Sequence, residues 1–456
     1  MAAVKTVAKT SKRGSSHSSS SLYFKNMLSN GLTLLRIPMK GVQSVTVLAL
    51  VNTGSRYEKP AWGGISHFLE HMVFKGTEKY PTAQDLAAAV DAVGAEFNAF
   101  TSKEYTGYYV KAASEHMPLA VDVVSDMLLT PTLRKDDLER EKGVIVEEIN
   151  MYNDTPMRHI GDIFEQVLFA GSPLGRDIIG TKETVRGLSR EDFVAYVKEW
   201  YGLGNVVLTV AGDATIVGGD SIVHDIERAF SKKSDTSNRK NGGERALKTF
   251  TKTLFTGERV KVEYKKTDQA HFIMAVPGIT RTDPQRYALQ VLAAIFGGNM
   301  SSRLFTEVRE KRGLCYYVRS DLDYYHDTGV FGASAGVDPT RVEEAIRVVR
   351  EEFFHLLDTQ GPRVITEIEL QRAKDYMTGS TILDMEDTKT VASHYGATQL
   401  LTGKTETVEE ELEKIRAVQL TDVRAIAKKL IDEKRLYFVM IGPFEEQEKF
   451  EKLVMG

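Results

Sequence analysis

The sequence predicts a mixed α/β protein that consists of two homologous domains. Two observations lead to this prediction. Strands and helices alternate along the chain, which is typical of layered α/β structures. In addition, the segment from Val185 to Gly212 recurs 230 positions later, from Ile415 to Gly442. A single internal repeat at half the chain length indicates that one domain was duplicated.

The elements of each half follow from hydrophobic periodicity and turn signals. Asn30-Gly31 predicts a turn between two antiparallel strands. The strands expected in the first half are Tyr23–Leu28, Leu32–Ile37, Ser44–Asn52, Glu96–Ala99, Thr106–Ala112 and Asn205–Ala211. The helices expected there are Gly64–Phe74, Thr82–Val93, Glu115–Leu129, Lys135–Tyr152 and Arg190–Tyr201. In the second half, the strand His271–Val276 again precedes a helix, and the strand Leu436–Ile441 again comes near the end of the repeat.

The domain boundaries follow from two polar segments. Residues 231–245 contain no large apolar residue but include Gly242-Gly243, so they are expected to be a linker. Residues 1–22 are rich in Ser, Ala, Thr and Lys, and the first acidic residue is Glu58. They are expected to form a disordered basic tail, with a mitochondrial or chloroplast transit peptide as the alternative. The predicted domains are therefore residues 23–230 and 246–456.

Composition excludes several classes of protein. The net charge of the 456 residues is −4, and no dense basic block with interleaved aromatic residues occurs, so nucleic acid is not an expected partner. No apolar run approaches the roughly 20 residues that span a bilayer, so no membrane span is expected. The single cysteine, Cys315, cannot form an internal disulfide, which suits a reducing compartment.

The strongest chemical signal is a pair of histidines with a glutamate between them. His67 and His71 are four residues apart and share one face of the expected helix. Two imidazoles at this spacing can hold one zinc ion, and Glu70 can take a proton from water without being a ligand. The alternative is a surface helix with two histidines. Because the flanking residues are apolar, the helix is expected to be buried and the polar trio to need partners.

The expected helix Lys135–Tyr152 offers a third ligand. Glu141 and Glu148 are seven residues apart and fall on its apolar face, whereas Glu147 points about 100° away. Carboxylates on an apolar face are costly unless they are paired or bind a metal. Glu148 is assigned as the third zinc ligand, and Glu141 as a partner for a ligating imidazole. The alternative is a solvated acidic pair, Glu147-Glu148.

These motifs resemble the pitrilysin–insulinase family of zinc peptidases. The family pattern, His-x-x-Glu-His followed about 76 residues later by Glu, fits the gap from His71 to Glu148. Other similar segments are Asn52–Arg56 (NTGSR), His67–Glu78 (HFLEHMVFKGTE), Ala95–Thr101 (AEFNAFT) and Glu141–Ile149 (EKGVIVEEI). The resemblance implies two homologous α/β domains that face each other across a cavity, with zinc ligands only in the first.

The resemblance also implies substrate-binding residues. In active relatives an arginine and a tyrosine seven residues later bind the substrate, and Arg309 and Tyr316 match that spacing. An edge strand around Asn98 accepts the peptide by β-addition in relatives, which explains tolerance of many sequences. From the residues alone, a charged helix end, a core tyrosine and an ordinary strand are the commoner explanations.

The function that these features predict is zinc-dependent endopeptidase activity on extended or unfolded peptides, with one Zn²⁺ per chain. The alternatives are a presequence-processing peptidase and a non-catalytic subunit of the same family. Because the zinc motif and the Arg309/Tyr316 pair occur in one short chain, the sequence resembles bacterial members that act as homodimers. A homodimer in a bacterial cytoplasm is therefore expected, with the mitochondrial matrix as the alternative.

Overall fold

A computed structural model describes residues 6–10, 21–231 and 258–456, and the chain divides into two compact units. The first unit contains residues 1–149, 177–250 and 383–407. The second unit contains residues 150–176, 251–382 and 408–456. Each unit therefore includes one segment from the other half of the sequence.

The first unit is built on a mixed sheet, which has seven strands within the described residues, in the order β1-β2-β3-β7-β4-β6-β5. These strands are β1 (Thr6–Thr10), β2 (Ser21–Met27), β3 (Thr33–Met39), β4 (Ser44–Val51), β5 (Glu96–Thr101), β6 (Thr106–Ala113) and β7 (Val206–Asp213). The helices of this unit are α1 (Ile65–Val73), α2 (Ala83–Asp91), α3 (Met117–Leu129), α4 (Lys135–Asn153, ending in the second unit), α6 (Lys182–Gly187), α7 (Arg190–Trp200), α8 (Ala214–Val217), α9 (Ser221–Ala229) and α14 (Thr388–Thr402).

The second unit has a smaller sheet, with five strands in its described part, in the order β10-β11-β9-β12-β8. These strands are β8 (Val260–Tyr264), β9 (Ala270–Pro277), β10 (Cys315–Tyr324), β11 (Gly329–Val337) and β12 (Tyr437–Gly442). The helices are α5 (Pro156–Leu168), α11 (Arg286–Gly297), the π-helix η7 (Phe305–Glu310), α12 (Val342–His355), α13 (Glu367–Asp384, ending in the first unit), α15 (Val408–Ala417), α16 (Leu420–Leu430) and α17 (Gln447–Met455).

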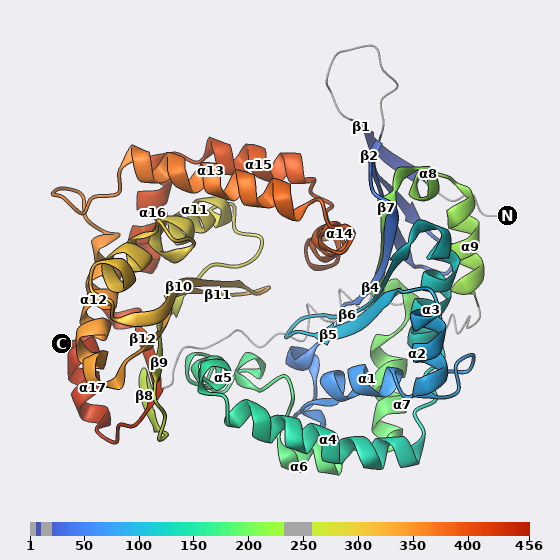
Figure 1. Cartoon of the computed structure of the whole chain (residues 1–456), viewed down its shortest axis with the longest axis horizontal. Helices are drawn as coiled ribbons and strands as arrows, with labels where there is room; N and C mark the ends of the chain where they lie inside the picture. The colour runs from blue at the N-terminus through green and yellow to red at the C-terminus, as the bar shows by residue number, and fades with distance from the viewer. Residues whose placement is uncertain (1–5, 11–20, 232–257) are drawn as a thin grey trace. The chain divides into compact units, whose positions relative to one another are not determined.

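The two sheets share one topology, which confirms the predicted duplication. Read as β3-β7-β4-β6-β5, the first sheet matches β8-β12-β9-β11-β10 strand for strand. The pairs β3/β7 and β8/β12 are both parallel, whereas β4 and β9 each have two antiparallel neighbours. Helices α1 and α11 both follow the middle strand of these five (Figure 1). The predicted mixed α/β fold of two homologous domains is therefore correct.

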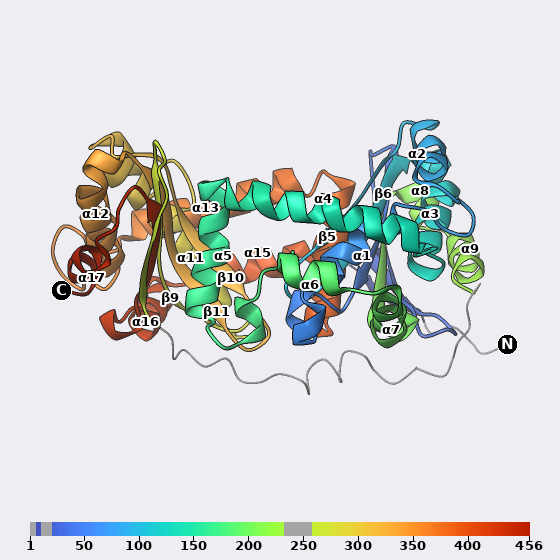
Figure 2. The ribbon, with the colours of Figure 1, turned by 90° about the horizontal axis from the view of Figure 1, so that it is seen from below.

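In each sheet both faces of the central strand are buried, which explains why this strand is almost wholly apolar. In β4, Val45, Val47 and Ala49 face the core under α3. On the other face Thr46 bonds to Thr388 of α14, with the two hydroxyl oxygens 2.8 Å apart. In the second unit, alternate residues of β9 face either the main core or the apolar side of α5, which lies along β9 and β12 (Figure 2).

Helix α5 comes from the first half of the sequence but covers the sheet of the second unit. Helix α14 comes from the second half but covers the sheet of the first unit. This exchange differs from the predicted linear division into residues 23–230 and 246–456. The reason is that α5 presents an apolar face, with Ile160, Ile163 and Phe164 buried against β9 and β12. Such a face is stable only where a second sheet surface can cover it.

Two predicted segments lie at the limits of the described residues. The predicted linker, residues 231–245, lies outside them except for Ser231. Within the predicted disordered tail, residues 1–5 and 11–20 also lie outside, but residues 6–10 form β1 and pair antiparallel with β2. The exposed edge of β2 offers unpaired backbone groups, which an adjacent polar segment can satisfy despite its low hydrophobicity.

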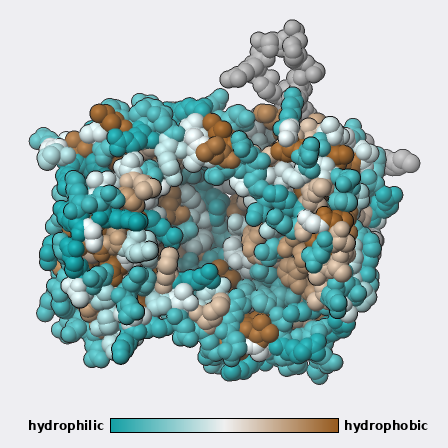
Figure 3. Space-filling model, viewed as in Figure 1, coloured by the Kyte–Doolittle hydropathy of each residue, from teal (hydrophilic) through white to brown (hydrophobic). Residues whose placement is uncertain are grey.

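The surface of the molecule is mainly hydrophilic on the face drawn in Figure 3, with scattered apolar patches. In the part of the chain that the structure describes, no helix has the length and apolar character needed to cross a membrane.

Candidate metal centre

Helix α1 starts at a fixed point because two groups hold its first turn. Gly64 has φ +91°, and a Cβ there would lie 2.5 Å from the carbonyl oxygen of Ile179, so the close approach requires glycine. The buried carboxylate of Glu58 accepts hydrogen bonds from the backbone N–H groups of Gly64 and Ser66, at 2.9 and 2.8 Å. It satisfies donors that the helix leaves unpaired and complements the helix dipole.

The buried side of α1 locks its rotation. Six of its nine residues are buried, and the three that stay partly exposed are His67, Glu70 and His71. Phe68 packs edge-on against Phe193, with ring centroids 5.0 Å apart. The helix therefore turns its polar side away from the core.

His67, His71 and Glu148 converge, and within the described ranges they are the one group of side chains that could hold a metal ion. Nε2 of His67 lies 3.7 Å from Oε1 of Glu148, and Nε2 of His71 lies 3.4 Å from Oε2. One donor atom from each residue falls within 4.8 Å of the others. Glu148 comes from α4 and lies 77 positions after His71, so two helices distant in the sequence build the cluster.

Glu141, one of the carboxylates on the apolar face of α4, orients the second histidine. Its Oε1 lies 2.9 Å from Nδ1 of His71, and its Oε2 lies 2.7 Å from the ammonium nitrogen of Lys75. A carboxylate at Nδ1 favours a proton on that nitrogen, so that in the neutral imidazole the lone pair lies on Nε2. This is the nitrogen that points at Glu148.

The electrostatics of the cluster favour a cation. Burial, followed by the charge of His71, lowers the pKa of His67 to about 4. Burial also acts to lower the pKa of His71, but its hydrogen bonds to Glu141 and Glu148 outweigh burial and raise that pKa to about 9. The two carboxylates thus favour a proton on His71. Two imidazoles and one carboxylate are a donor set that suits zinc, and a divalent cation could take over the role of that proton.

Glu70 stands apart from the three possible ligands. Its Oε2 accepts a hydrogen bond of 2.7 Å from the hydroxyl of Thr101, the last residue of β5. Burial raises the pKa of Glu70, although the bond from Thr101 opposes the shift. A carboxylate with a raised pKa is suited to accepting and returning a proton.

Strand β5 lies at the edge of its sheet, where β6 is its one described partner strand. Asn98 is exposed on this strand, and its side-chain oxygen accepts a hydrogen bond from the backbone N–H of Ala99 at 2.8 Å. The outer edge of β5 thus has no paired strand in the described residues.

Arg309 and Tyr316 belong to the second unit. Arg309 is exposed on η7, and the central carbon of its guanidinium lies 5.0 Å from the ring centroid of Phe305. Tyr316 lies on β10 and is 76 % exposed. Tyr316 is therefore not the core tyrosine of the commoner explanation, whereas Arg309 lies in the last turn of η7, where a charged helix end would place it.

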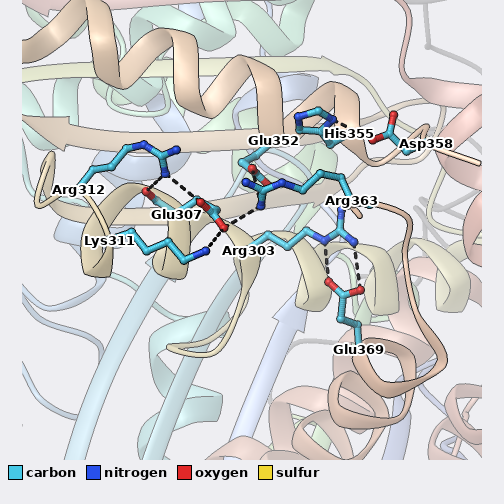
Figure 4. A network of polar contacts seen from close by, with 9 residues as sticks. All are labelled: Arg303, Glu307, Lys311, Arg312, Glu352, His355, Asp358, Arg363 and Glu369. Carbon is cyan, nitrogen blue, oxygen red and sulfur yellow. Dashed lines mark hydrogen bonds and ion pairs between the residues drawn. The ribbon is translucent and has the colours of Figure 1, made fainter. Parts of the chain in front are cut away.

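An ion network holds η7 in place (Figure 4). The carboxylate of Glu307 is buried and bonds to Arg363 and Lys311 at 2.7 Å and to Arg312 at 2.9 Å. These contacts, led by Arg363, hold the pKa of Glu307 well below its usual range. Two further ion pairs extend this network. Arg303 pairs with Glu369 of α13, and Arg363 contacts Glu352 of α12.

Three residues near the cluster are missed by reasoning from the sequence: Glu58, Lys75 and Thr101. Lys75 lies four residues after His71, a helical spacing that could have indicated its approach to Glu141. Glu58 and Thr101 come from a loop and a strand, and their contacts with α1 depend on how the chain folds back. No local pattern signals them.

Comparison with known proteins identifies the family. Residues 37–182 match the family description "Insulinase (Peptidase family M16)", and residues 187–377 match "Peptidase M16 inactive domain". The chain belongs to peptidase family M16, the insulinase family. The cluster of His67, His71 and Glu148 lies in the stretch that matches the peptidase domain of family M16, whereas Arg309 and Tyr316 lie in the stretch that matches its inactive domain.

Bacterial members of family M16 are similar to this chain over nearly its whole length. A protein of Streptomyces coelicolor named an uncharacterized zinc protease is 37% identical over 93% of this chain and 90% of its own length. The uncharacterized zinc protease YmxG of Bacillus subtilis is 36% identical over 89% of this chain and 94% of its own. The crystal structure of a protease from Helicobacter pylori has the same fold, with a TM-score of 0.79 at 20% identity, covering 92% of this chain and 99% of that one.

Proposed function

We propose that this protein is a zinc metalloendopeptidase that hydrolyses extended or unfolded peptides. The observation that carries the proposal is the convergence of His67, His71 and Glu148, with Glu70 on the same helix as the two histidines. The relatives that are named zinc proteases support it.

In this proposal His67, His71 and Glu148 hold one zinc ion. A zinc ion held there would act as a Lewis acid, lowering the pKa of water and polarising a peptide carbonyl. Glu70 is the general base: its carboxylate takes a proton from the attacking water and returns that proton to the leaving amine. Glu141 keeps the proton of His71 on Nδ1 and so keeps the opposite nitrogen turned toward the ligand cluster.

Substrate binding is assigned to both units. The free edge of β5 around Asn98 can pair with an extended peptide through main-chain hydrogen bonds, which do not read the peptide's side chains. Arg309 and Tyr316 are proposed to bind the substrate carbonyl and to stabilise the negative charge that develops on it. Their exposure supports this role.

The assembly and location proposed are a homodimer in the bacterial cytoplasm. The homodimer rests on the presence of the zinc motif and the Arg309/Tyr316 pair in one short chain, and the bacterial relatives support a bacterial source. A presequence-processing peptidase of the mitochondrial matrix is the second candidate, because no acidic residue precedes Glu58. The two candidates differ in substrate: processing predicts cleavage at one site in a basic presequence, whereas general peptide degradation predicts many sites.

The test combines metal analysis with a cleavage profile on a library of unstructured, fluorescence-quenched peptides. We expect one zinc per chain and cleavage at many sequences. The variant Glu70→Gln should keep zinc and lose hydrolysis by about 10²–10⁴-fold, because it removes the base but not a ligand. Full activity in this variant would falsify the role of Glu70. A zinc-loaded wild-type chain without any hydrolysis would instead favour a non-catalytic subunit.

A further inference from the structure

The hydroxyl of Thr101 makes the one hydrogen bond that the Glu70 carboxylate has within the described residues. The distance of 2.7 Å to Oε2 is that of a strong bond between a hydroxyl and a charged oxygen. We propose that Thr101 is a positioning residue, which fixes the orientation of the Glu70 carboxylate and leaves Oε1 to accept the proton of the attacking water. This inference rests on the proposed function.

The need for such a residue follows from the freedom of a glutamate side chain. The terminal torsion of a glutamate has no sharp preferred angle, so packing of the helix alone does not set the direction of the carboxylate. Catalysis by a general base requires the accepting oxygen to stay within hydrogen-bond reach of the proton. One bond to one oxygen removes this freedom and keeps the other oxygen available.

Thr101 can act in this way because its own backbone is anchored. Thr101 pairs with Thr106 at the end of the β5/β6 ladder. The turn that follows is held by backbone bonds from Ser55 to Ser102, at 3.2 Å, and from Arg56 to Lys103, at 2.9 Å.

A buried ion pair and a glycine strengthen this anchor. Arg56 and Glu104 form an ion pair of 2.9 Å, and each residue is 3% exposed. A Cβ at Gly54 would lie 2.2 Å from the carbonyl oxygen of Ser102, so the close approach of the two segments requires glycine. The hydroxyl of Thr101 is therefore carried by a rigid edge of the sheet and not by a mobile loop.

The test uses the zinc-loaded full-length chain and one well-cleaved fluorescence-quenched peptide from the library. Thr101→Val removes the hydroxyl at nearly constant shape, and Thr101→Ser keeps it. Thr33→Val is the matched control, because Thr33 is also a strand threonine of the first unit and its hydroxyl contacts the sulfur of Met27 instead. We expect Thr101→Val to lower kcat about 10- to 100-fold, with KM and zinc content unchanged. Thr101→Ser should retain most of kcat, and Thr33→Val should equal the wild type.

Crystal structures of the zinc-loaded variants give a readout that does not depend on activity. The Glu70 carboxylate should have one orientation in the wild type and in Thr101→Ser, but several in Thr101→Val. The inference is overturned if Thr101→Val keeps the wild-type kcat, if Thr101→Ser loses as much as Thr101→Val, or if zinc is lost with activity. An inactive Glu70→Gln beside a fully active Thr101→Val rejects this inference alone, whereas an active Glu70→Gln rejects the proposed function.

Discussion

Helices α1 and α11 hold equivalent places in the two units, but their side chains differ in kind. Each follows the middle strand of the five that the sheets share. In α1, His67, Glu70 and His71 remain partly exposed. In α11, ten of twelve residues are buried, and the helix contains neither a histidine nor an acidic residue. The fold therefore does not require polar groups at this place, and their presence in α1 indicates a role in metal binding or catalysis.

The carboxylates near these two helices also have different partners. Around α1, carboxylates face histidines: Glu141 and Glu148 approach His71, and the second unit has no such cluster among its described residues. After α11, carboxylates face permanently charged cations, and Glu307 is surrounded by Arg363, Lys311 and Arg312 (Figure 4). Arginine and lysine neutralise a carboxylate without leaving a lone pair for a metal. The second arrangement thus serves structure, and the first leaves donor atoms available.

Among substitutions that test the difference between α1 and α11, the loss of a histidine from α1 should have the largest effect. His71→Ala removes one nitrogen donor and the partner of Glu141, so zinc and hydrolysis should both fall to background. Gln290→Ala in α11 is the control, and its zinc content and activity should match the wild type. Zinc content is measured by elemental analysis, and hydrolysis with the peptide library. Retention of zinc by His71→Ala would contradict the assigned ligand set.

A smaller effect is expected from the carboxylate behind the ligand. Glu141→Gln weakens the bond to Nδ1 of His71 and removes the charge that faces Lys75, so zinc affinity should fall about 10- to 100-fold. Glu147→Gln, on the exposed side of the same helix, is the matched control and should leave zinc affinity unchanged. Competition with a zinc chelator measures both. Equal affinities in the two variants would show that Glu141 does not support the ligand.

The network of the second unit should instead affect stability, with a defined pH dependence. Because the folded pKa of Glu307 is depressed, its contribution is fully present above its unfolded pKa, about 4.3, and is lost as pH falls through the folded value. Glu307→Gln removes the carboxylate charge that Lys311, Arg312 and Arg363 share, and should cost about 2 kcal/mol at pH 7, since the cations are partly solvated. The cost should shrink below about pH 4.

Urea unfolding of Glu307→Gln and the wild type at pH 7 and at low pH measures this difference. The comparison of the two regions predicts that zinc content stays the same in the variant. A cost that does not change with pH would show that the charge of Glu307 is not what stabilises the segment.

The smallest effect concerns the exchanged helix α14. A Cβ at Gly396 would lie 2.6 Å from the hydroxyl oxygen of Thr209 and 2.9 Å from Cδ1 of Leu50. Gly396→Ala should therefore force α14 away from the sheet and cost about 1–2 kcal/mol. Gly379→Ala in α13 meets nothing within 4 Å and should stabilise the protein by about 0.5–1 kcal/mol. Thermal unfolding of both variants is the measurement, and a shift of the same sign in both would contradict this packing.

The sequence predicts most of the local elements and the relation of nearby side chains. His67 and His71 share a helical face because their spacing is four, and Glu141 and Glu148 do so because theirs is seven. Glu148 is placed beside the two histidines because a carboxylate on an apolar helix face needs a partner or a metal, and the resemblance to a family agrees with this assignment. The hydrogen bond from Thr101 to Glu70 escaped prediction, because a strand and a helix meet there through tertiary packing.

What the sequence by itself determined is the duplicated α/β pattern and the set of residues able to hold a metal. Hydrophobic period, turn signals and spacing are local properties, and they survive in any fold that keeps the helices and strands. Only the tertiary structure decided that α5 and α14 are exchanged between the units, that Glu58 caps α1 and that Thr101 holds Glu70. These contacts depend on which distant surfaces bury each other, and burial is a property of the whole chain rather than of any segment.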